Sequence, residues 1–382
     1  MVRWARCFIS ASWHALDVGR RLFSNLLFLL LILAMLALAL YNLPKRLEDK
    51  TALLLDFKGS LVEQHAANED VWMLTGVGED FNKGDTQLRD ILQVLETAAH
   101  DPKITSAVLL LDDLRSSGLP MLREVAAALE RFKASGKPVI AWGSGYDQRQ
   151  YFLASHANEV FLDPMGQVLL EGFGHYRNYY RDVLDKLGIT VNLMRVGTYK
   201  SFAEPFIANG PSPAATEAER VLYTALWNAY TDEVEKARKL PAGSLNQNID
   251  DLPQLMATEH GDASKLALSI RWVDGLKTRD QLKQLMIAKG APDSEGKSFR
   301  QISFDDYLAR QKSRKSGDAV AVVVAEGEIR DGQAQAGAVG GLSTAKLIRT
   351  AREDDQFKAI VLRINSPGGS AYASELIRRE LE

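Results

Sequence analysis

Short apolar runs alternate with amphipathic stretches along most of the chain after Lys50. The runs are rich in Leu, Val and Ile, which predicts buried strands at 52–57, 106–113, 138–143 and 159–164. Apolar residues at helical spacing, or a Pro-Ser-Pro start signal, predict helices at 85–101, 121–136, 150–157 and 211–240. Because apolar strands that alternate with helices are typical of parallel sheets, we predict an α/β fold with mostly parallel strands.

The same order of elements begins again near the end of the chain. Residues 319–329 predict a strand, 343–355 predict a helix, and 359–382 align on 107–130 without a gap, with four of 24 positions identical. We interpret this as a tandem duplication of one α/β unit. The second copy stops in its second helix, and a half-copy cannot bury the face of its sheet. We therefore expect the chain to be a fragment of a longer protein.

Residues 26–40 are fifteen consecutive apolar residues, and 22–41 form a run of twenty with two polar interruptions. Twenty helical residues span about 30 Å, the thickness of a bilayer core. Arginines dominate the preceding flank, which predicts a cytoplasmic N-terminus and places the rest of the chain across the membrane. We favour an uncleaved signal anchor; the alternatives are a cleaved signal peptide, since Ala37-Leu38-Ala39 resembles a cleavage site, and a buried core helix.

These patterns divide the chain into five parts. Residues between the two α/β patterns are polar and rich in Gly and Ser, which predicts a linker. The predicted parts are a cytoplasmic N-terminus at 1–21, a transmembrane anchor at 22–41, a first repeat at 50–288, a linker at 289–318 and the start of a second repeat at 319–382.

Composition excludes several classes of function. The net charge of −3 shows no basic excess for nucleic acid. The single cysteine, Cys7, precedes the apolar segment, so an intrachain disulfide is excluded. The six histidines are scattered, and none has the spacing of a zinc peptidase. We expect neither a metal nor a cofactor.

Ser370 is a candidate nucleophile, because it follows a strand and a Pro-Gly-Gly turn and opens a helix. Gly368 and Gly369 allow a tight turn whose N–H groups can bind a developing oxyanion. The local pattern by itself favours the alternative that Ser370 is only a helix N-cap. Ser366 and Ser374 are weaker candidates, because the first precedes proline and the second lies within the helix.

A nucleophilic serine needs a base, and the sequence places no histidine near this turn. A buried lysine can serve, because desolvation lowers its pKa toward neutrality. The candidate is Lys200, which follows a strand-like run at 189–196 and a Gly-Thr turn, amid Tyr199, Phe202 and Phe206. The alternative is that Lys200 is a solvated loop lysine.

Several segments taken together are specific for one family. They are RVGTYKS-x-x-EPF at 195–206, SPAATEAE at 212–219 and INSPGGS at 364–370, with GKPVIAWG at 136–143 and YFLASHANEVFLDP at 151–164. With the apolar segment, they resemble the long, two-repeat form of the SppA-type signal peptide peptidases. Neither the lysine motif nor the serine motif would be sufficient without the other.

The resemblance implies a fold and a chemistry. Each repeat would have a fold like that of the Clp protease and crotonase. Lys200, in the T-Y-K-S motif, would be the general base and proton donor. Ser370, in the P-G-G-S motif, would be the nucleophile, and the backbone of Gly368 and Gly369 would contribute to the oxyanion site. The Ser–Lys dyad would then draw one residue from each repeat.

The resemblance also implies a setting. The enzyme would be a serine endopeptidase and a homotetramer, single-pass in the inner (plasma) membrane, with its catalytic part on the extracytoplasmic side. Its substrates would be cleaved signal peptides and other apolar extended peptides, and it would need no cofactor. In the family a further serine downstream of the nucleophile orients the lysine. Its segment is absent here, which puts the activity of this piece by itself in doubt.

Two other functions fit parts of the pattern. A crotonase-type acyl-CoA enzyme would share the fold and use paired N–H groups on a thioester, but it would not explain the apolar segment or the pairing of serine with lysine. An inactive, membrane-tethered scaffold would explain the missing end. Acyl-CoA turnover, peptide cleavage and serine-reactive labelling distinguish these functions.

Overall fold

The computed structural model describes residues 21, 24–35, 47–65, 84–311 and 317–382. The chain divides into an N-terminal unit, Met1–Leu47, and a main unit, Glu48–Glu382. In the N-terminal unit, residues 24–35 form a helix with exposed apolar side chains. The remainder of the predicted anchor lies outside the described residues. Within the described part of the chain, no helix is long and apolar enough to cross a bilayer.

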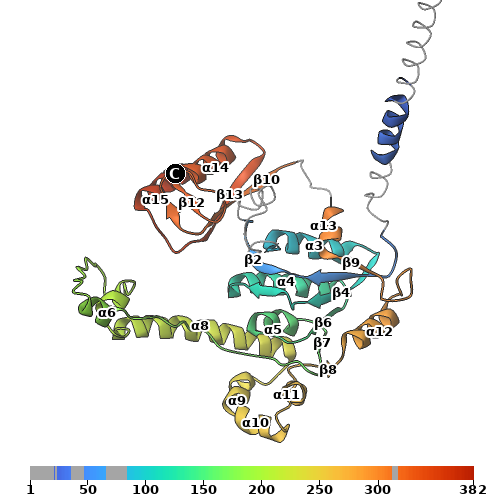
Figure 1. The fold of residues 1–382 in the computed structure, drawn as a ribbon, viewed down its shortest axis with the longest axis horizontal. Helices are drawn as coiled ribbons and strands as arrows, with labels where there is room; N and C mark the ends of the chain where they lie inside the picture. Colours follow the sequence, from blue (N-terminus) through green and yellow to red (C-terminus); the bar gives the residue numbers. More distant parts are fainter. Residues whose placement is uncertain (1–20, 22–23, 36–46, 66–83, 312–316) are drawn as a thin grey trace, which may run out of the picture. The chain divides into compact units, whose positions relative to one another are not determined.

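The first part of the main unit is built on a parallel sheet of six strands (Figure 1). Its neighbours pair in the order β8-β7-β6-β4-β1-β9, and every pair is parallel. The bounds along that order are Gly275–Leu276, Glu159–Leu162, Val139–Gly143, Ile104–Leu110, Thr51–Asp56 and Gln301–Ser303. The four strands predicted from the sequence are confirmed, and so is the parallel α/β class.

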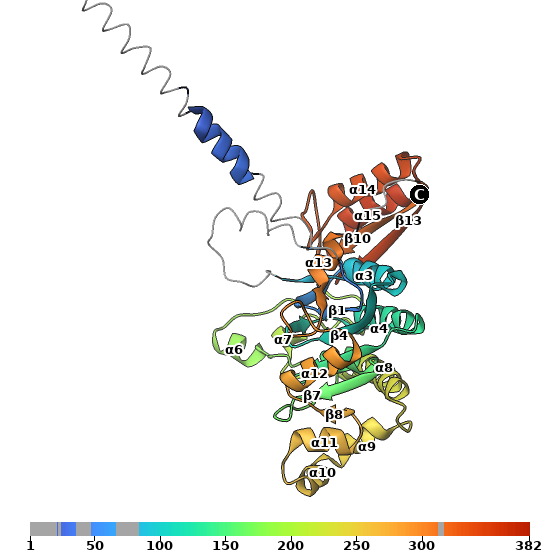
Figure 2. The same cartoon turned by 90° about the vertical axis from the view of Figure 1, so that its right-hand side faces the viewer.

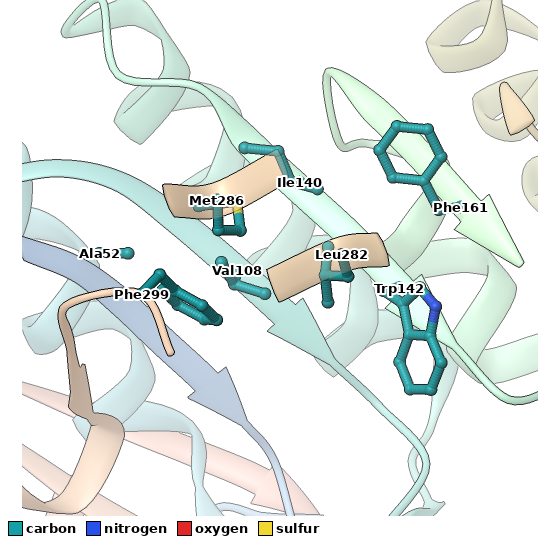
Figure 3. Packing of buried hydrophobic residues seen from close by; sticks show 8 residues of the cluster. All are labelled: Ala52, Val108, Ile140, Trp142, Phe161, Leu282, Met286 and Phe299. Carbon is teal, nitrogen blue, oxygen red and sulfur yellow. The ribbon is translucent and has the colours of Figure 1, made fainter. Parts of the chain in front are cut away.

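Strands β1 and β4 are buried on both faces, as their apolar composition requires. On one face, helix α12 (Arg279–Lys289) packs Leu282 and Met286 against the sheet (Figure 3). The other residues of this core cluster are Ala52, Val108, Ile140, Trp142, Phe161 and Phe299. Side chains that alternate with these along the two strands point to the other face, and Leu53 and Leu109 there are fully buried.

Three helices confirm the helical predictions in this part of the chain. Their bounds are Leu88–His100 for α3, Leu119–Ala134 for α4 and Gln148–Ser155 for α5. Each buries an apolar stripe; in α3 the stripe is Leu88, Ile91, Val94, Leu95 and Ala98. Asp147 begins α5 with a capping box, because its carboxylate accepts from the backbone of Gln150 while the Gln150 side chain accepts from the backbone of Asp147.

The prediction of a linker at 289–318 is wrong for its central part. Residues 301–303 form β9, which pairs with β1, and Phe304–Ala309 form helix α13. Phe299, Ile302, Phe304 and Tyr307 are buried. Charged and polar neighbours separate these four residues along the chain, so the average composition hides a segment that completes the core of the first sheet.

The second part of the main unit repeats an order of elements found in the first. Its elements are β10 (Ala319–Glu326), β11 (Ile329–Arg330), β12 (Val339–Gly340), α14 (Gly341–Glu353), β13 (Phe357–Asn365) and α15 (Ala371–Leu381). The earlier elements are β1, β2 (Gly59–Val62), β3 (Thr86–Gln87), α3, β4 and α4, with the short β5 (Leu114–Ser116) before α4. Strands β10 and β13 pair in parallel as β1 and β4 do, and β11 pairs with β12 as β2 pairs with β3.

The two parts match at individual residues as well. Gly59 and Gly327 both have positive φ, and their N–H groups donate to the carbonyls of Asp113 and Asn365. Counting back from the two glycines, Leu53 of β1 corresponds to Ala321 of β10. Leu53 pairs with Ala107 of β4, whereas Ala321 pairs with Ile360 of β13, so the register of the second pair differs by one residue. The ungapped sequence alignment, which places Ala359 on Ala107, therefore fails in the strand. Because a one-residue shift exchanges the two faces, the shift decides which side chains are buried.

Helices α14 and α15 cover one face of the β10–β13 pair (Figure 2). Their Ile348 and Ile377 pack with Val323 and Ala325. The opposite face is open, with Val320 and Val322 more than half exposed, at 54% and 59%. The equivalent face of the first sheet is the one that α12 covers.

A long helix, α8 (Pro213–Arg238), extends away from the first sheet (Figure 1). It begins as predicted, with Ser212 as N-cap and Pro213 in the first turn. Short helices precede and follow it: α6 (Arg181–Lys186), α7 (Glu204–Ile207), α9 (Ser244–Asp250), α10 (Leu252–Thr258) and α11 (Ala263–Ser269). The strand-like run at 189–196 is not a strand; its residues are exposed, and no described strand pairs with it.

Candidate active site

Ser370 lies between the end of β13 and the start of α15. Its hydroxyl oxygen accepts a hydrogen bond from the N–H of Ala373 at 3.2 Å, so the residue is the helix N-cap. The same hydroxyl donates to a carboxylate oxygen of Asp331, which follows β11. The side chain is half-buried, so it remains accessible. Ser370 thus combines the N-cap geometry with an accessible hydroxyl that donates to a carboxylate, Asp331.

The turn before Ser370 requires glycine. Gly368 and Gly369 have φ of +101° and +152°, values that side chains with a Cβ rarely adopt. A Cβ on Gly369 would lie 2.1 Å from the carbonyl oxygen of Ile329. This close approach allows two hydrogen bonds, from the N–H of Ile329 to the oxygen of Gly368 at 3.0 Å and from the N–H of Ser370 to the oxygen of Ile329 at 2.9 Å.

The two glycines differ in what their N–H groups can bind. The N–H of Gly368 donates to the hydroxyl of Ser366 at 3.1 Å. The N–H of Gly369 has no acceptor among the residues that the structure describes. An unpaired N–H beside a helix N-terminus suits a developing negative charge. Gly369 is therefore the better placed of the two predicted oxyanion donors.

Lys200 lies in the loop before α7, and its environment differs from the prediction of a buried base. The side chain is exposed and runs along Gly197, and its N–H donates to the Gly197 carbonyl at 3.4 Å. The neighbouring aromatic side chains are exposed too, with Tyr199 at 59% and Phe202 at 90%. Among the described residues, none packs over the Lys200 side chain, so its amine is exposed to solvent. In the described part of the chain, no hydrogen bond or ion pair joins Lys200 to Ser370.

Comparison with known proteins identifies a family domain within the chain. Residues 131–289 match the model of "Peptidase family S49". The chain is 36% identical over 386 aligned residues to "Protease 4" of Salmonella typhi, an alignment that covers 99% of the chain and 62% of that protein. The chain therefore contains a peptidase S49 domain. It is also 33% identical to "Protease 4" of Haemophilus influenzae (97% and 62% covered) and 27% identical to "Serine protease SPPA, chloroplastic" of Arabidopsis thaliana (79% and 44%).

The S49 match includes Lys200 and ends before Ser370. The chain spans about 62% of the length of the two "Protease 4" relatives. Among solved structures, an enoyl-CoA hydratase/carnithine racemase from Magnetospirillum magneticum aligns at 12% identity and a TM-score of 0.25, covering 53% of this chain and 64% of that chain.

The first part of the chain has no serine at the position equivalent to Ser370. Its equivalent helix, α4, has Gly118 as N-cap, and Ser116 and Ser117 stand where the second part has the two glycines. A glycine N-cap offers no hydroxyl. The two parts therefore share an order of elements, but only the second has a hydroxyl at this helix N-terminus.

Two residues near the predicted dyad were missed by sequence reasoning. Asp331, which accepts from Ser370, is 39 residues away in the sequence and lies in a turn without a motif of its own. Glu204 belongs to the E-P-F of the lysine motif, yet only the structure shows that it is buried, at 4% exposure. No group of three or more potential metal ligands occurs among the described residues.

Proposed function

We propose that this chain is the dyad-bearing part of a membrane-anchored serine endopeptidase that degrades cleaved signal peptides. The observation that carries the proposal is the placement of Ser370, an accessible hydroxyl at a helix N-terminus in a chain that contains a peptidase-family domain. It follows a two-glycine turn in which the Gly369 N–H has no acceptor among the described residues. The relatives named as proteases support the reaction class. Substrate, anchoring and mechanism are parts of the proposal.

The proposed reaction starts with neutral Lys200 taking the proton of the Ser370 hydroxyl. The hydroxyl must therefore turn its proton from Asp331, its acceptor in the resting geometry, toward the amine of Lys200. The Ser370 oxygen attacks a peptide carbonyl, and the resulting oxyanion accepts from the N–H of Gly369. Protonated Lys200 then gives its proton to the leaving amine, and water hydrolyses the acyl-enzyme.

Lys200 needs an apolar cover before it can act as a base near neutral pH. The exposed rings of Tyr199, Phe202 and Phe206 beside it supply part of that cover once another surface packs on them. Desolvation of the amine would then lower its pKa. Exposed rings beside the base also suit an apolar, extended substrate such as the core of a signal peptide.

The larger architecture belongs to the same proposal. The repeated order of elements and the paired glycine contacts support a tandem duplication of one Clp- and crotonase-like repeat, of which 319–382 begins the second. We infer that the protein is a homotetramer in the inner membrane, held by the segment at 22–41, with the dyad on the extracytoplasmic side.

The test is fluorophosphonate labelling and peptide cleavage in the protein expressed from its own gene. Ser370→Ala should abolish labelling and cleavage, because the reactive oxygen is lost. Lys200→Met should reduce both by about 10³-fold or more, since proton transfer by a positioned base contributes roughly 10²–10⁴-fold and activates the nucleophile.

Ser294→Ala and Lys186→Met are matched controls that should keep wild-type rates, because each removes the same group from an exposed position outside the proposed dyad. Labelling that survives Ser370→Ala would overturn the assignment of the nucleophile. Turnover of acyl-CoA without peptide cleavage would favour a crotonase-type enzyme, and a protein that is never labelled would be an inactive scaffold.

A further inference from the structure

The loop that carries Lys200 is attached to helix α8 and its N-terminus by three side-chain contacts. The hydroxyl of Tyr199 donates to Glu217 of α8 at 3.3 Å. Arg177 donates to the carbonyl of Ser201 at 3.4 Å and lies 3.7 Å from Glu219 of α8. The third contact runs through a pair of charged residues, Arg195 and Glu204, that acts on Lys200 itself.

Arg195 holds the main chain of Lys200 directly. One guanidinium nitrogen, Nη1, donates to the Lys200 carbonyl at 3.2 Å and lies 3.7 Å from a carboxylate oxygen, Oε1, of Glu204. A guanidinium can contact several acceptors at once because its five donors have a fixed geometry. The charge of Glu204 thus fixes the arginine that fixes the lysine backbone.

Glu204 is placed for this role by burial. Its side chain is 5% exposed, and its other oxygen, Oε2, accepts from the N–H of Ser212 at 3.0 Å, where α8 begins. The hydrogen bond from Ser212 lowers the pKa of Glu204 below its ordinary value, and nearby Arg195 and Arg177 lower it further. Oε1 has no hydrogen-bond donor among the described residues, so the Arg195 guanidinium is the charge that faces it.

We propose that Arg195 and Glu204 are positioning residues for Lys200: they fix the backbone from which the lysine amine reaches the nucleophile. A carboxylate buried without a full set of donors is costly to keep unless its charge is used. Through its contacts with Ser212 and Arg195, the Glu204 carboxylate joins the start of α8 to the Lys200 loop. The inference rests on the proposed role of Lys200 as the base.

The experiment compares Glu204→Gln with wild type in the protein expressed from its own gene. Glutamine keeps the shape and can still accept from Ser212, but it removes the charge that holds Arg195. The expected result is a kcat for peptide cleavage about 10-fold lower with an unchanged KM, since small misplacements of a catalytic group cost up to roughly 10²-fold. The pH midpoint of kcat should stay the same, because the lysine is misplaced rather than electrostatically changed.

Two further variants sharpen the test. Arg195→Met should lower kcat as much as Glu204→Gln, and the double variant should be no worse than either one, because both changes break the same connection. Asp182→Asn removes a carboxylate of α6 that accepts from Asn209 at 2.8 Å, without touching the lysine loop, and should leave kcat unchanged.

The outcomes separate the two proposals. If Lys200→Met cleaves peptide like wild type, the proposed base is wrong and this inference fails with it. If Lys200→Met is inactive while Glu204→Gln is fully active, only the positioning role is overturned. A shifted pH midpoint in Glu204→Gln would also overturn it, because that shift would mean that the carboxylate acts through its field on the amine.

Discussion

At the scale of single residues, the candidate site depends on backbone conformations that few side chains allow. Gly369 brings its Cα against the carbonyl of Ile329, and this contact sets the direction of the next residue, Ser370. The Ser370 hydroxyl then serves the helix as a cap and remains available for chemistry. The candidate nucleophile is therefore positioned by a neighbour that has no side chain.

We predict that Gly369→Ala abolishes fluorophosphonate labelling of Ser370. The added Cβ would lie 2.1 Å from the Ile329 oxygen, so the two hydrogen bonds across this contact must break and the serine must move. The free energy of unfolding should also fall by about 1–3 kcal/mol from strain at this position. Labelling kinetics and urea unfolding measure the two effects.

Gly136→Ala is the matched control for that variant. Gly136 also has positive φ, at +86°, but a Cβ there would meet nothing within 4 Å. It should cost roughly 1 kcal/mol of stability and leave labelling unchanged. Equal loss of labelling in both variants would mean that general destabilisation, rather than the contact with Ile329, controls the serine.

At the scale of elements, α8 is held to the first sheet by an ion pair at its C-terminal end. Arg238, the last residue of α8, donates to both oxygens of Asp274 at 2.8 and 2.9 Å, and its side chain is only 7% exposed. Asp274 also accepts from the N–H of Val160 in β7 at 2.7 Å. The Asp274 carboxylate thus connects the C-terminal end of α8 to β7. The loop that carries Lys200 is attached to the other end of the same helix.

We predict that Asp274→Asn lowers the free energy of unfolding at pH 7 by about 1–2 kcal/mol, a value between those of exposed and buried ion pairs because Asp274 is partly exposed. Burial alone would raise the pKa of Asp274, but the hydrogen bonds from Arg238 and Val160 outweigh it and hold the pKa below 3.8. The stabilisation is therefore complete above about pH 4 and lost as the pH falls through the folded-state pKa.

The difference between wild type and Asp274→Asn should accordingly shrink in acid, as followed by urea unfolding from pH 7 to pH 3. Asp280→Asn removes an exposed carboxylate that pairs with Lys283 and should change little at any pH. A difference that grows in acid would contradict the assigned direction of the pKa shift.

At the scale of the main unit, one arginine joins its two parts. Arg363 of β13 pairs with Glu63, after β2, at 2.6 Å and with Glu124 of α4 at 2.5 Å. The side chain of Glu63 is 9% exposed, so its charge needs a partner. The two parts of the main unit are therefore joined by ion pairs as well as by the polypeptide chain.

We predict that Arg363→Met raises the hydrogen-exchange rates of β10 and β13 amides by about 10-fold, while β4 and β6 exchange as before. Removing the guanidinium leaves Glu63 and Glu124 without this shared partner, which weakens the contact between the parts. Arg330→Met is the control: it breaks an exposed pair between Arg330 of β11 and the preceding Glu328, and it should leave exchange unchanged. Uniform exchange in all variants would mean that Arg363 does not couple the two parts.

The sequence alone determined most of the elements and the candidate nucleophile. Local periodicity and start signals report on interactions between near neighbours, so the strands, the long helix after Ser212 and the helix opened by Ser370 could be predicted. The Pro-Gly-Gly-Ser turn could be recognised for the same reason, because its backbone conformation depends on the glycines themselves.

Tertiary structure alone decided the features that depend on distant contacts. The segment of β9 and α13 has the composition of a linker, and only the pairing of β9 with β1 shows that it belongs to the first sheet and its core. The one-residue shift in β13 is likewise shown only by its pairing with β10. The burial of Glu204 and the contact of Asp331 with Ser370 likewise join residues without a shared motif. Such contacts are fixed by packing of the whole chain, which no local pattern of residues encodes.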